Sequence, residues 1–272
     1  VTRRVIVAAA GCAAGAVLAQ IAHPLLNGAA LTAATLLAVV LFALAGLVHS
    51  LARYGRRGPL ALLVGASGLG LLVEAVGVRT GIPFGAYHYT GTLRPQVLGV
   101  PAVVPLAWLM MAYPCVLLGR RLAPEAGQRW RRVALGGWTL AAWDLFLDPQ
   151  MVAAGHWVWR DPAPHLPGVP QVPLTNYAGW LAASTMIVAV TDRLLPEGSV
   201  RGASEAVPGA LLAWTWLGST LANLAFFDRP WVALYGGVAM GLTVGPYLWT
   251  ARHRPPVAAS PSPVGHPIGQ AR

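Results

Sequence analysis

Long apolar stretches separated by short polar segments dominate the sequence as far as residue 251. A helix that crosses a bilayer needs about 20 mostly apolar residues. Stretches of that kind predict transmembrane helices at residues 5–22, 29–52, 59–78, 100–119, 131–149, 177–194, 207–227 and 231–251. The pattern therefore predicts an all-α integral membrane protein, a bundle of about eight transmembrane helices.

The two ends of the chain differ from this pattern. An alternative interpretation of residues 1–22 is a signal peptide, because Arg3 and Arg4 precede an Ala-rich run. No convincing small-residue cleavage site follows, which favours a helix. Residues 252–272 are rich in Pro, Ser and Gly and lack an apolar face, which predicts a disordered cytoplasmic tail. Residues 1–251 are expected to form a single transmembrane helical domain.

Composition agrees with a membrane protein. Hydrophobic residues make up 56% of the chain and charged residues only 10%, whereas soluble domains carry roughly 25% charged residues. The net charge of +10 comes from arginines in short clusters between apolar runs, which argues against a nucleic-acid partner. Cys12 and Cys115 lie inside apolar stretches, so neither a disulfide nor a Cys-ligated metal is expected.

The arginines also predict an orientation, because cytoplasmic loops carry the excess of positive charge. With the N-terminus inside, the outer loops hold only Arg79, Arg94, Arg160 and Arg229, and the other basic residues fall on the cytoplasmic side. We therefore expect a multi-pass protein of the cell membrane with both termini cytoplasmic.

Glu74, Asp144 and Asp148 lie within the apolar stretches, near their outer ends. A charge near the hydrocarbon core costs at least ~2.5 kcal/mol, so ionisable residues there usually face a protein interior and mark a functional site. The two longest outer loops, 79–99 and 150–176, are expected to cover these acids. The sequence thus predicts a site at the outer membrane boundary.

Asp144 and Asp148 are spaced i, i+4, so they share one helix face. Two carboxylates so close in an apolar region do not both ionise at low cost, and one is expected to keep its proton and act as a donor. The structural alternative is that Asp148 caps a turn beside Pro149 while Asp144 pairs with Arg79 or Arg160.

Aromatic residues are frequent in the outer third of the predicted bundle. Trp and Tyr commonly form belts at membrane interfaces, and most of these residues are expected to do so. One or two tryptophans next to the acids are candidates to stabilise a cation through their π faces. The histidines of the outer loops, His88, His156 and His165, have no recognised metal-binding spacing, so no metal is expected.

Five ordered blocks then make the sequence recognisable: GIPFGAYHYT (81–90), VPLAWLMMAYP (104–114), WDLFLDPQMV (143–152), GHWVW (155–159) and PLTNYAGW (173–180). They resemble the integral-membrane carotenoid biosynthesis family, which includes bisanhydrobacterioruberin hydratase and carotenoid 1,2-hydratase. The resemblance runs from about Glu74 to Trp180. It implies cofactor-independent addition of water to the terminal double bond of a linear carotenoid, giving a tertiary alcohol.

The residues fit that chemistry, which needs protonation of an alkene, a tertiary carbocation and capture by water. Our hypothesis makes Asp144 the acid, with Asp148 or Glu74 orienting it or accepting the proton of the attacking water. The expected substrate-binding residues are aromatic or amide side chains near these acids: Phe84, Tyr87, Tyr89, Trp108, Trp143, Trp157, Trp159, Asn176 and Tyr177. The apolar body of the carotenoid is expected to lie between helices and reach the bilayer laterally.

Several alternatives share some of these features. End-group cyclisation starts from the same protonation, and a membrane prenyltransferase would use aspartates to bind Mg²⁺ and a diphosphate. The single Asp-xxx-Asp on the outer side disfavours prenyl transfer. A transporter or carotenoid-binding scaffold is the non-enzymatic alternative, disfavoured by the absence of an internal repeat. The expected partners are a linear carotenoid and the lipid bilayer, with other membrane enzymes of the carotenoid pathway as candidates.

Overall fold

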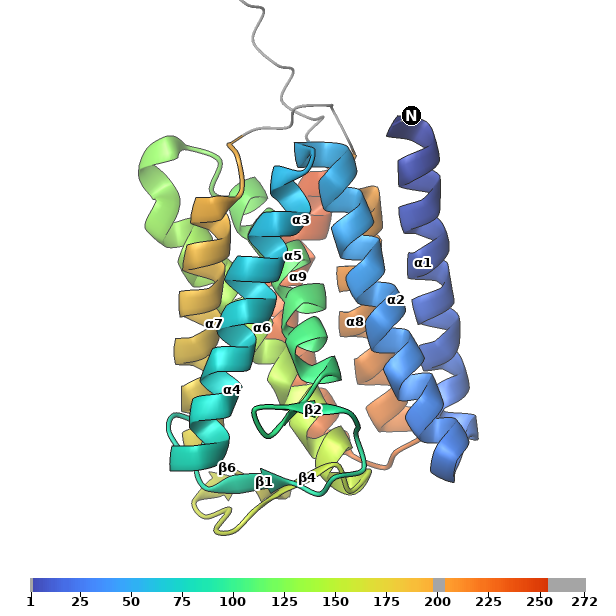
Figure 1. The fold of residues 1–272 in the computed structure, drawn as a ribbon, viewed down its shortest axis with the longest axis vertical. Helices are drawn as coiled ribbons and strands as arrows, with labels where there is room; N and C mark the ends of the chain where they lie inside the picture. The colour runs from blue at the N-terminus through green and yellow to red at the C-terminus, as the bar shows by residue number, and fades with distance from the viewer. Residues whose placement is uncertain (1, 198–203, 254–272) are drawn as a thin grey trace, which may run out of the picture.

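The computed structural model describes residues 2–197 and 204–253, most of which form helices arranged side by side as a bundle (Figure 1). The chain runs through α1 (Thr2–Ala22), η1 (His23–Leu25), α2 (Gly28–Tyr54), α3 (Arg57–Leu62), η2 (Leu63–Gly68), α4 (Leu69–Thr80), α5 (Val103–Leu122), η3 (Ala126–Gln128), α6 (Arg129–Ala153), α7 (Leu174–Leu194), α8 (Ala206–Ala225) and α9 (Pro230–His253). Since α3, η2 and α4 follow one another without a break, every predicted apolar stretch coincides with one helical segment.

Five segments of the described chain are long and apolar enough to cross a membrane: Arg3–Leu25, Gly28–Tyr54, Arg57–Thr80, Val103–Leu122 and Pro230–His253. The other three long helices, α6, α7 and α8, fall short of that apolarity. The protein is therefore a mostly helical membrane protein.

Several boundaries differ from the sequence prediction. The stretch 100–119 begins with a short strand, Val100–Pro101, and its helix, α5, starts at Val103. α9 continues to His253, so residues 252 and 253 are helical and do not belong to the predicted tail. The rest of that tail, 254–272, lies outside the described residues. α6 continues to Ala153 with Pro149 inside it, because proline is tolerated in membrane helices whose neighbours satisfy the freed backbone groups.

The loops at one end of the bundle contain short strands that the sequence analysis did not predict (Figure 1). They form three two-stranded antiparallel ladders: β1 (Tyr87–Tyr89) with β4 (Trp157–Trp159), β2 (Gln96–Val97) with β3 (Val100–Pro101), and β5 (His165–Leu166) with β6 (Val169–Pro173). Strand pairing satisfies the backbone groups of these loops and gives this end of the bundle an ordered cover.

Glycines bring α6 close to its neighbours on both sides. A Cβ atom on Gly136 would lie 2.8 Å from the Cys115 carbonyl oxygen of α5, and one on Gly137 would lie 2.8 Å from the Thr185 hydroxyl of α7. Small residues permit such close approach in membrane helices. This packing fixes the position of α6, and therefore of the two aspartates it carries.

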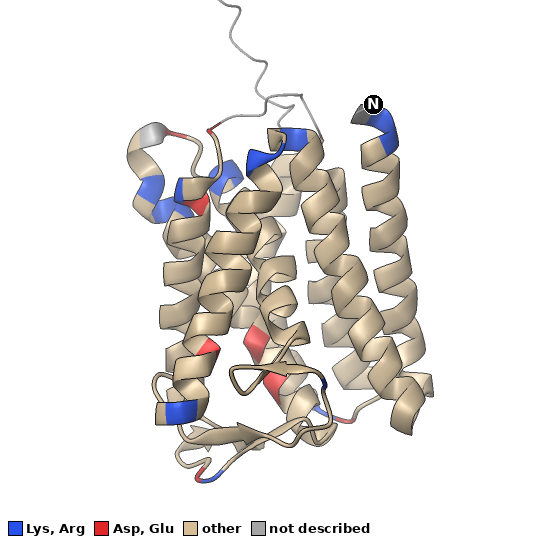
Figure 2. Ribbon diagram, viewed as in Figure 1, with Lys and Arg blue, Asp and Glu red and all other residues tan. Residues whose placement is uncertain are grey.

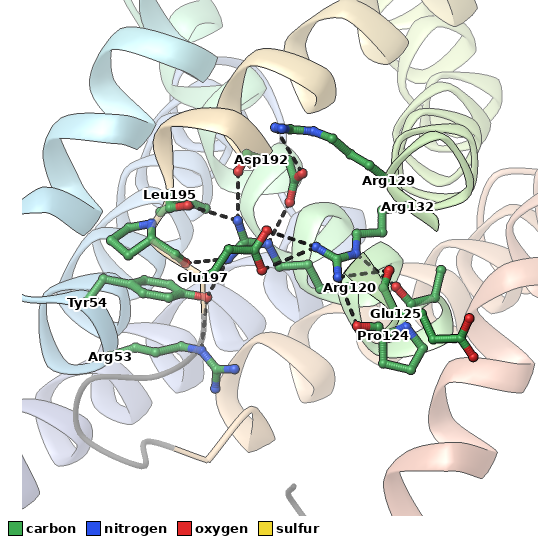
Figure 3. A network of polar contacts seen from close by, with 12 residues as sticks. Arg53, Tyr54, Arg120, Pro124, Glu125, Arg129, Arg132, Asp192, Leu195 and Glu197 are labelled. Carbon is green, nitrogen blue, oxygen red and sulfur yellow. Dashed lines mark hydrogen bonds and ion pairs between the residues drawn. The ribbon is translucent and has the colours of Figure 1, made fainter. Parts of the chain in front are cut away.

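The opposite end of the bundle, where α1 begins, holds most of the basic residues (Figure 2). Its polar network is built around arginines (Figure 3). Arg120 donates to Asp192 Oδ1 at 2.6 Å and to the carbonyl oxygens of Asp192, Leu195 and Pro196. The last carbonyls of a helix lack partners within it, so Arg120 caps the end of α7. Charged contacts thus stabilise one end, and the site described next lies in the other half.

Candidate active site

Glu74 lies on the buried side of α4 and is only 5% exposed. Three side chains donate hydrogen bonds to its carboxylate. The Tyr87 and Tyr89 hydroxyls donate to Oε2 at 2.5 and 2.8 Å, and the Trp108 indole donates to Oε1 at 3.1 Å. An ionised carboxylate only accepts hydrogen bonds, so this arrangement suits an acceptor that carries negative charge.

Glycines on both sides of Glu74 let these aromatic rings approach it. Positions 70, 74 and 77 share one face of a helix. A Cβ atom on Gly70 would lie 2.7 Å from the Trp108 ring, and one on Gly77 would lie 3.1 Å from the Tyr87 hydroxyl. The glycines of this segment therefore make room for the partners of Glu74, a more specific role than general helix packing.

The tyrosines reach this position because the loop after α4 forms a short strand. β1 pairs with β4, which sets Tyr87 opposite Trp159 and Tyr89 opposite Trp157. Successive side chains of a strand point to opposite faces. The four aromatic residues consequently share the face that meets the helices, while the residue between each pair is exposed.

Further hydrogen bonds join the two loops at both ends of this ladder. Arg160 N donates to the Ala86 carbonyl at 2.9 Å, and Thr90 N donates to the His156 carbonyl at 3.0 Å. The Thr92 hydroxyl also contacts His156 Nδ1 at 2.8 Å, and burial lowers the pKa of this histidine. The loop after α4 and the loop after α6 therefore cover the site together.

The hydroxyls of Tyr87 and Tyr89 remain neutral donors. Burial, and after it the charge of Glu74, raises the pKa of both hydroxyls far above their ordinary value. Loss of either proton would place two negative charges in contact. The tyrosines therefore hold Glu74 by hydrogen bonds without becoming charged themselves.

Asp144 and Asp148 lie one turn apart on α6 and are 0% and 3% exposed. The Asn176 amide of α7 donates to Asp144 Oδ2 at 2.9 Å and also to Asp148 Oδ2. Trp157 Nε1 donates to Asp148 Oδ1 at 3.0 Å. Asn176 therefore bridges the two carboxyl groups, while Asp144 Oδ1 is buried and has no hydrogen-bond partner among the described residues.

The structural alternative for these aspartates is wrong. Asp148 lies inside α6 and caps no turn. Within residues 2–197 and 204–253, the ion pairs do not include either aspartate. Arg79 donates instead to the Ala75 carbonyl at 2.8 Å. The pair is held by neutral donors, and no arginine neutralises its charge.

A tryptophan that was not among the expected substrate-binding residues joins the aromatic rings around the acids. Trp180 stacks on Trp108 with ring centroids 4.1 Å apart and planes 17° apart. The Trp143 ring meets it edge to face at 5.9 Å, and the Phe84 ring lies 6.3 Å away. Stacked and edge-on pairs stabilise aromatic clusters, so these rings form one continuous surface.

Glu74 and Asp148 line the same cavity, which has a volume of about 60 Å³. Nine of the sequence candidates contribute to its lining: Glu74, Phe84, Tyr87, Tyr89, Trp108, Asp148, Trp157, Trp159 and Asn176. Asp144, Trp143 and Tyr177 do not line it. Asp144 contacts the lining through Asn176, and Trp143 through Trp180.

Other lining residues were not among the candidates. Besides Trp180, they are aliphatic or small side chains of the loop and helices: Thr35, Val39, Leu93, Val103, Val104, Ala107, Leu147 and Met151. In sequence they resemble ordinary apolar positions of membrane helices. Across the described part of the chain, the His, Cys, Asp and Glu side chains form no group of three or more suited to hold a metal ion.

Comparison with known proteins places the chain in a family. The model of the family described as "carotenoid biosynthesis protein" matches residues 30–244. The chain belongs to this family. This carotenoid biosynthesis family member is 33% identical to bisanhydrobacterioruberin hydratase of Haloarcula japonica over 186 residues, which are 66% of the chain and 59% of that relative. The match thus spans less than two thirds of the relative's length. No solved structure matches the chain.

Gly70→Ala tests whether Trp108 must stay close to Glu74. The new Cβ would lie 2.7 to 2.8 Å from three atoms at the base of the Trp108 side chain, whose ring stacks on Trp180. We expect a loss of about 1–3 kcal/mol in unfolding free energy from overpacking, together with reduced turnover. Gly11→Ala, on α1 with no atom within 4 Å of the new Cβ, is the control. Equal thermal unfolding and activity in both variants would contradict this account.

Proposed function

We propose that this protein is a carotenoid hydratase, which adds water to the terminal 1,2 double bond of an acyclic carotenoid end group. The observation that carries the proposal is a cavity lined by the buried acids Glu74 and Asp148 and by aromatic rings. The name of the Haloarcula japonica relative, a hydratase, supports the same reaction type.

The aspartate pair supplies the proton. Protonating the less substituted alkene carbon needs an acid next to an apolar substrate. Asp148 lines the cavity and Asp144 does not, so Asp148 is the immediate donor, and Asp144 supports it through the shared Asn176 amide. Our sequence hypothesis gave the donor role to Asp144. The geometry favours a pair that acts as a unit, with Asp148 facing the substrate.

Glu74 and the aromatic rings then act on the cation. The negative charge of Glu74 and the π faces of the lining aromatic residues stabilise a tertiary carbocation. Glu74 is also the base that takes a proton from the attacking water. The cycle closes when that proton returns to the aspartate pair, so the net reaction consumes one water. No cofactor enters this proposal.

The same proposal includes a membrane topology. We place eight helical crossings in the cell membrane, with α3, η2 and α4 as one crossing and both termini on the cytoplasmic side. The concentration of basic residues at the end of the bundle where α1 begins supports this orientation (Figure 2). The cavity then lies near the outer boundary of the bilayer. The partners are a linear carotenoid and membrane lipid, with other carotenoid-pathway membrane enzymes as candidates.

Expression in a host that makes lycopene tests the reaction. We expect the extracted pigment to gain the mass of one water for each end group that reacts, with a hydroxyl on the end group. A pigment of changed retention but unchanged mass would indicate cyclisation. Pigment that copurifies with the protein but is chemically unchanged would indicate a scaffold. Either of these results would contradict the hydratase proposal.

A further inference from the structure

The lining of the cavity contains two chemically different sets of side chains. The acids Glu74 and Asp148 and the aromatic rings around them are almost fully buried. A second set comes from α2 and α5 and is aliphatic or small and only partly buried: Thr35, Val39, Val103, Val104 and Ala107. A ligand in this cavity therefore meets both buried acids and a partly exposed apolar surface.

The cavity is too small for a whole polyene. Its volume is about 60 Å³, and one water occupies about 10–15 Å³ on this measure. The space accommodates a branched isoprenoid tip together with the attacking water. The rest of a long linear substrate has to lie outside, so the cavity must open along the path of the chain.

The partly buried lining residues lie on α2 and α5, which marks the side on which the cavity opens. The two helices approach each other at Gly46, where an added Cβ would lie 3.5 Å from the Tyr113 ring. Toward its N-terminal end, α2 leans away from α4 and α5 (Figure 1). Next to the lining positions on α2, Leu37 and Val40 are 51% and 37% exposed. Such apolar exposure on a membrane helix indicates contact with hydrocarbon.

The β2–β3 hairpin borders the same opening. Leu93, just before it, lines the cavity, and Val103 and Val104 follow it directly. At its tip, Val97 and Leu98 are 47% and 57% exposed. Two adjacent exposed aliphatic side chains on a hairpin suit the apolar part of the membrane boundary better than water. This opening, the mouth of the cavity, is therefore bordered by apolar side chains of α2 and α5 and of the β2–β3 hairpin.

From this arrangement we infer that the substrate enters sideways from the bilayer between α2 and α5, and that the site recognises one end group without measuring the length of the chain. This inference rests on the proposed function and adds substrate selectivity to it. The tip lies among the aromatic rings, the first part of the polyene crosses the aliphatic mouth, and the remainder stays in lipid. Each end of a symmetrical carotenoid then reacts in a separate binding event.

Two measurements test the inference. The first compares wild-type kcat/KM for linear carotenoids that share an end group and differ in chain length. We expect similar values, and release of singly hydrated product before the second end reacts. A steep dependence on chain length, or exclusive formation of the doubly hydrated product from the earliest time points, would overturn the inference.

The second measurement blocks the mouth with Ala107→Trp. We expect kcat/KM for a full-length carotenoid to fall at least about tenfold relative to kcat/KM for a short isoprenoid alkene with the same end group. Leu242→Trp, on the exposed side of α9 and outside the cavity lining, is the matched control and should leave the ratio unchanged. Val39→Trp narrows the mouth from α2 if Ala107→Trp does not fold. An equal loss for both substrates would overturn the inference, whereas a wild-type protein inactive on both would contradict the proposed function.

Discussion

Asp148→Asn is expected to lower the rate of hydration by about 10²–10⁴-fold, the usual contribution of a general acid. The amide keeps the size of the side chain and can still accept the hydrogen bond from Trp157, but it has no acidic proton to transfer. Rates are measured as hydroxylated product formed from an acyclic carotenoid by protein purified in detergent. Thermal unfolding of the same sample shows whether the helical bundle is retained.

Two further substitutions test whether the loss of activity is specific to Asp148. Asp228→Asn is the matched control, because Asp228 is exposed outside the cavity at φ 50°, a conformation that asparagine adopts readily. It should keep wild-type activity. Asp144→Asn should reduce the rate less than Asp148→Asn, since Asp144 acts through its partner. A folded Asp148→Asn protein with full activity, or a loss confined to Asp144→Asn, would refute Asp148 as the donor.

Glu74→Gln is expected to reduce hydration by about 10²–10³-fold, comparable to removal of one preorganised electrostatic group. Glutamine has no negative charge to stabilise the cation and no basic oxygen to take a proton from water. Its amide NH₂ group would also face donors, because two tyrosine hydroxyls and the Trp108 indole point at this side chain. Product formation is again the measurement, with Glu74→Asp as the variant that keeps the charge.

The Glu74→Gln and Asp148→Asn variants should lose different steps of the reaction. In deuterium oxide, Glu74→Gln should still protonate the alkene and release it again, so the recovered carotenoid should carry deuterium at its end groups without added water. Asp148→Asn should recover unlabelled carotenoid. Wild-type hydration by Glu74→Gln, or the same labelling pattern in both variants, would show that the roles of the two acids are not separate.

The helices were predictable because their signal is local. An apolar stretch of membrane length specifies a helix whatever it packs against, and each of the eight stretches is helical over most of its length. The ends were less predictable. The sequence analysis ended one helix at Pro149, yet α6 continues to Ala153, because contacts with neighbouring helices outweigh the local effect of the proline.

The strands that carry part of the site were missed for the opposite reason. β1 and β4 have three residues each and pair across the chain, with Tyr87 opposite Trp159. The alternation Tyr-His-Tyr and Trp-Val-Trp was visible in the sequence. Three residues are too few to distinguish a strand from a loop, and the pairing exists only after the helices have brought the two loops together.

The site itself was partly predictable. Acids in an apolar region stand out because their burial is costly, and Glu74 and Asp148 do line one cavity. Spacing showed that Asp144 and Asp148 share a helix face but not which of them reaches the cavity, since that depends on the rotation of α6 in the bundle. The sequence did not identify Thr35 and Val39 as cavity-lining residues. Positions that line the opening of the cavity and positions that face lipid carry the same kinds of side chain.

The origin of the atoms added to the carotenoid tests the central claim most directly. Wild-type protein is incubated with an acyclic carotenoid in deuterium oxide enriched in heavy oxygen, and the product is analysed by mass spectrometry and NMR. Our account predicts one non-exchangeable deuterium on the carbon next to the new tertiary alcohol and a heavy oxygen in its hydroxyl group. A hydroxyl oxygen that does not come from water, or an alcohol with no deuterium on the adjacent carbon, would contradict it.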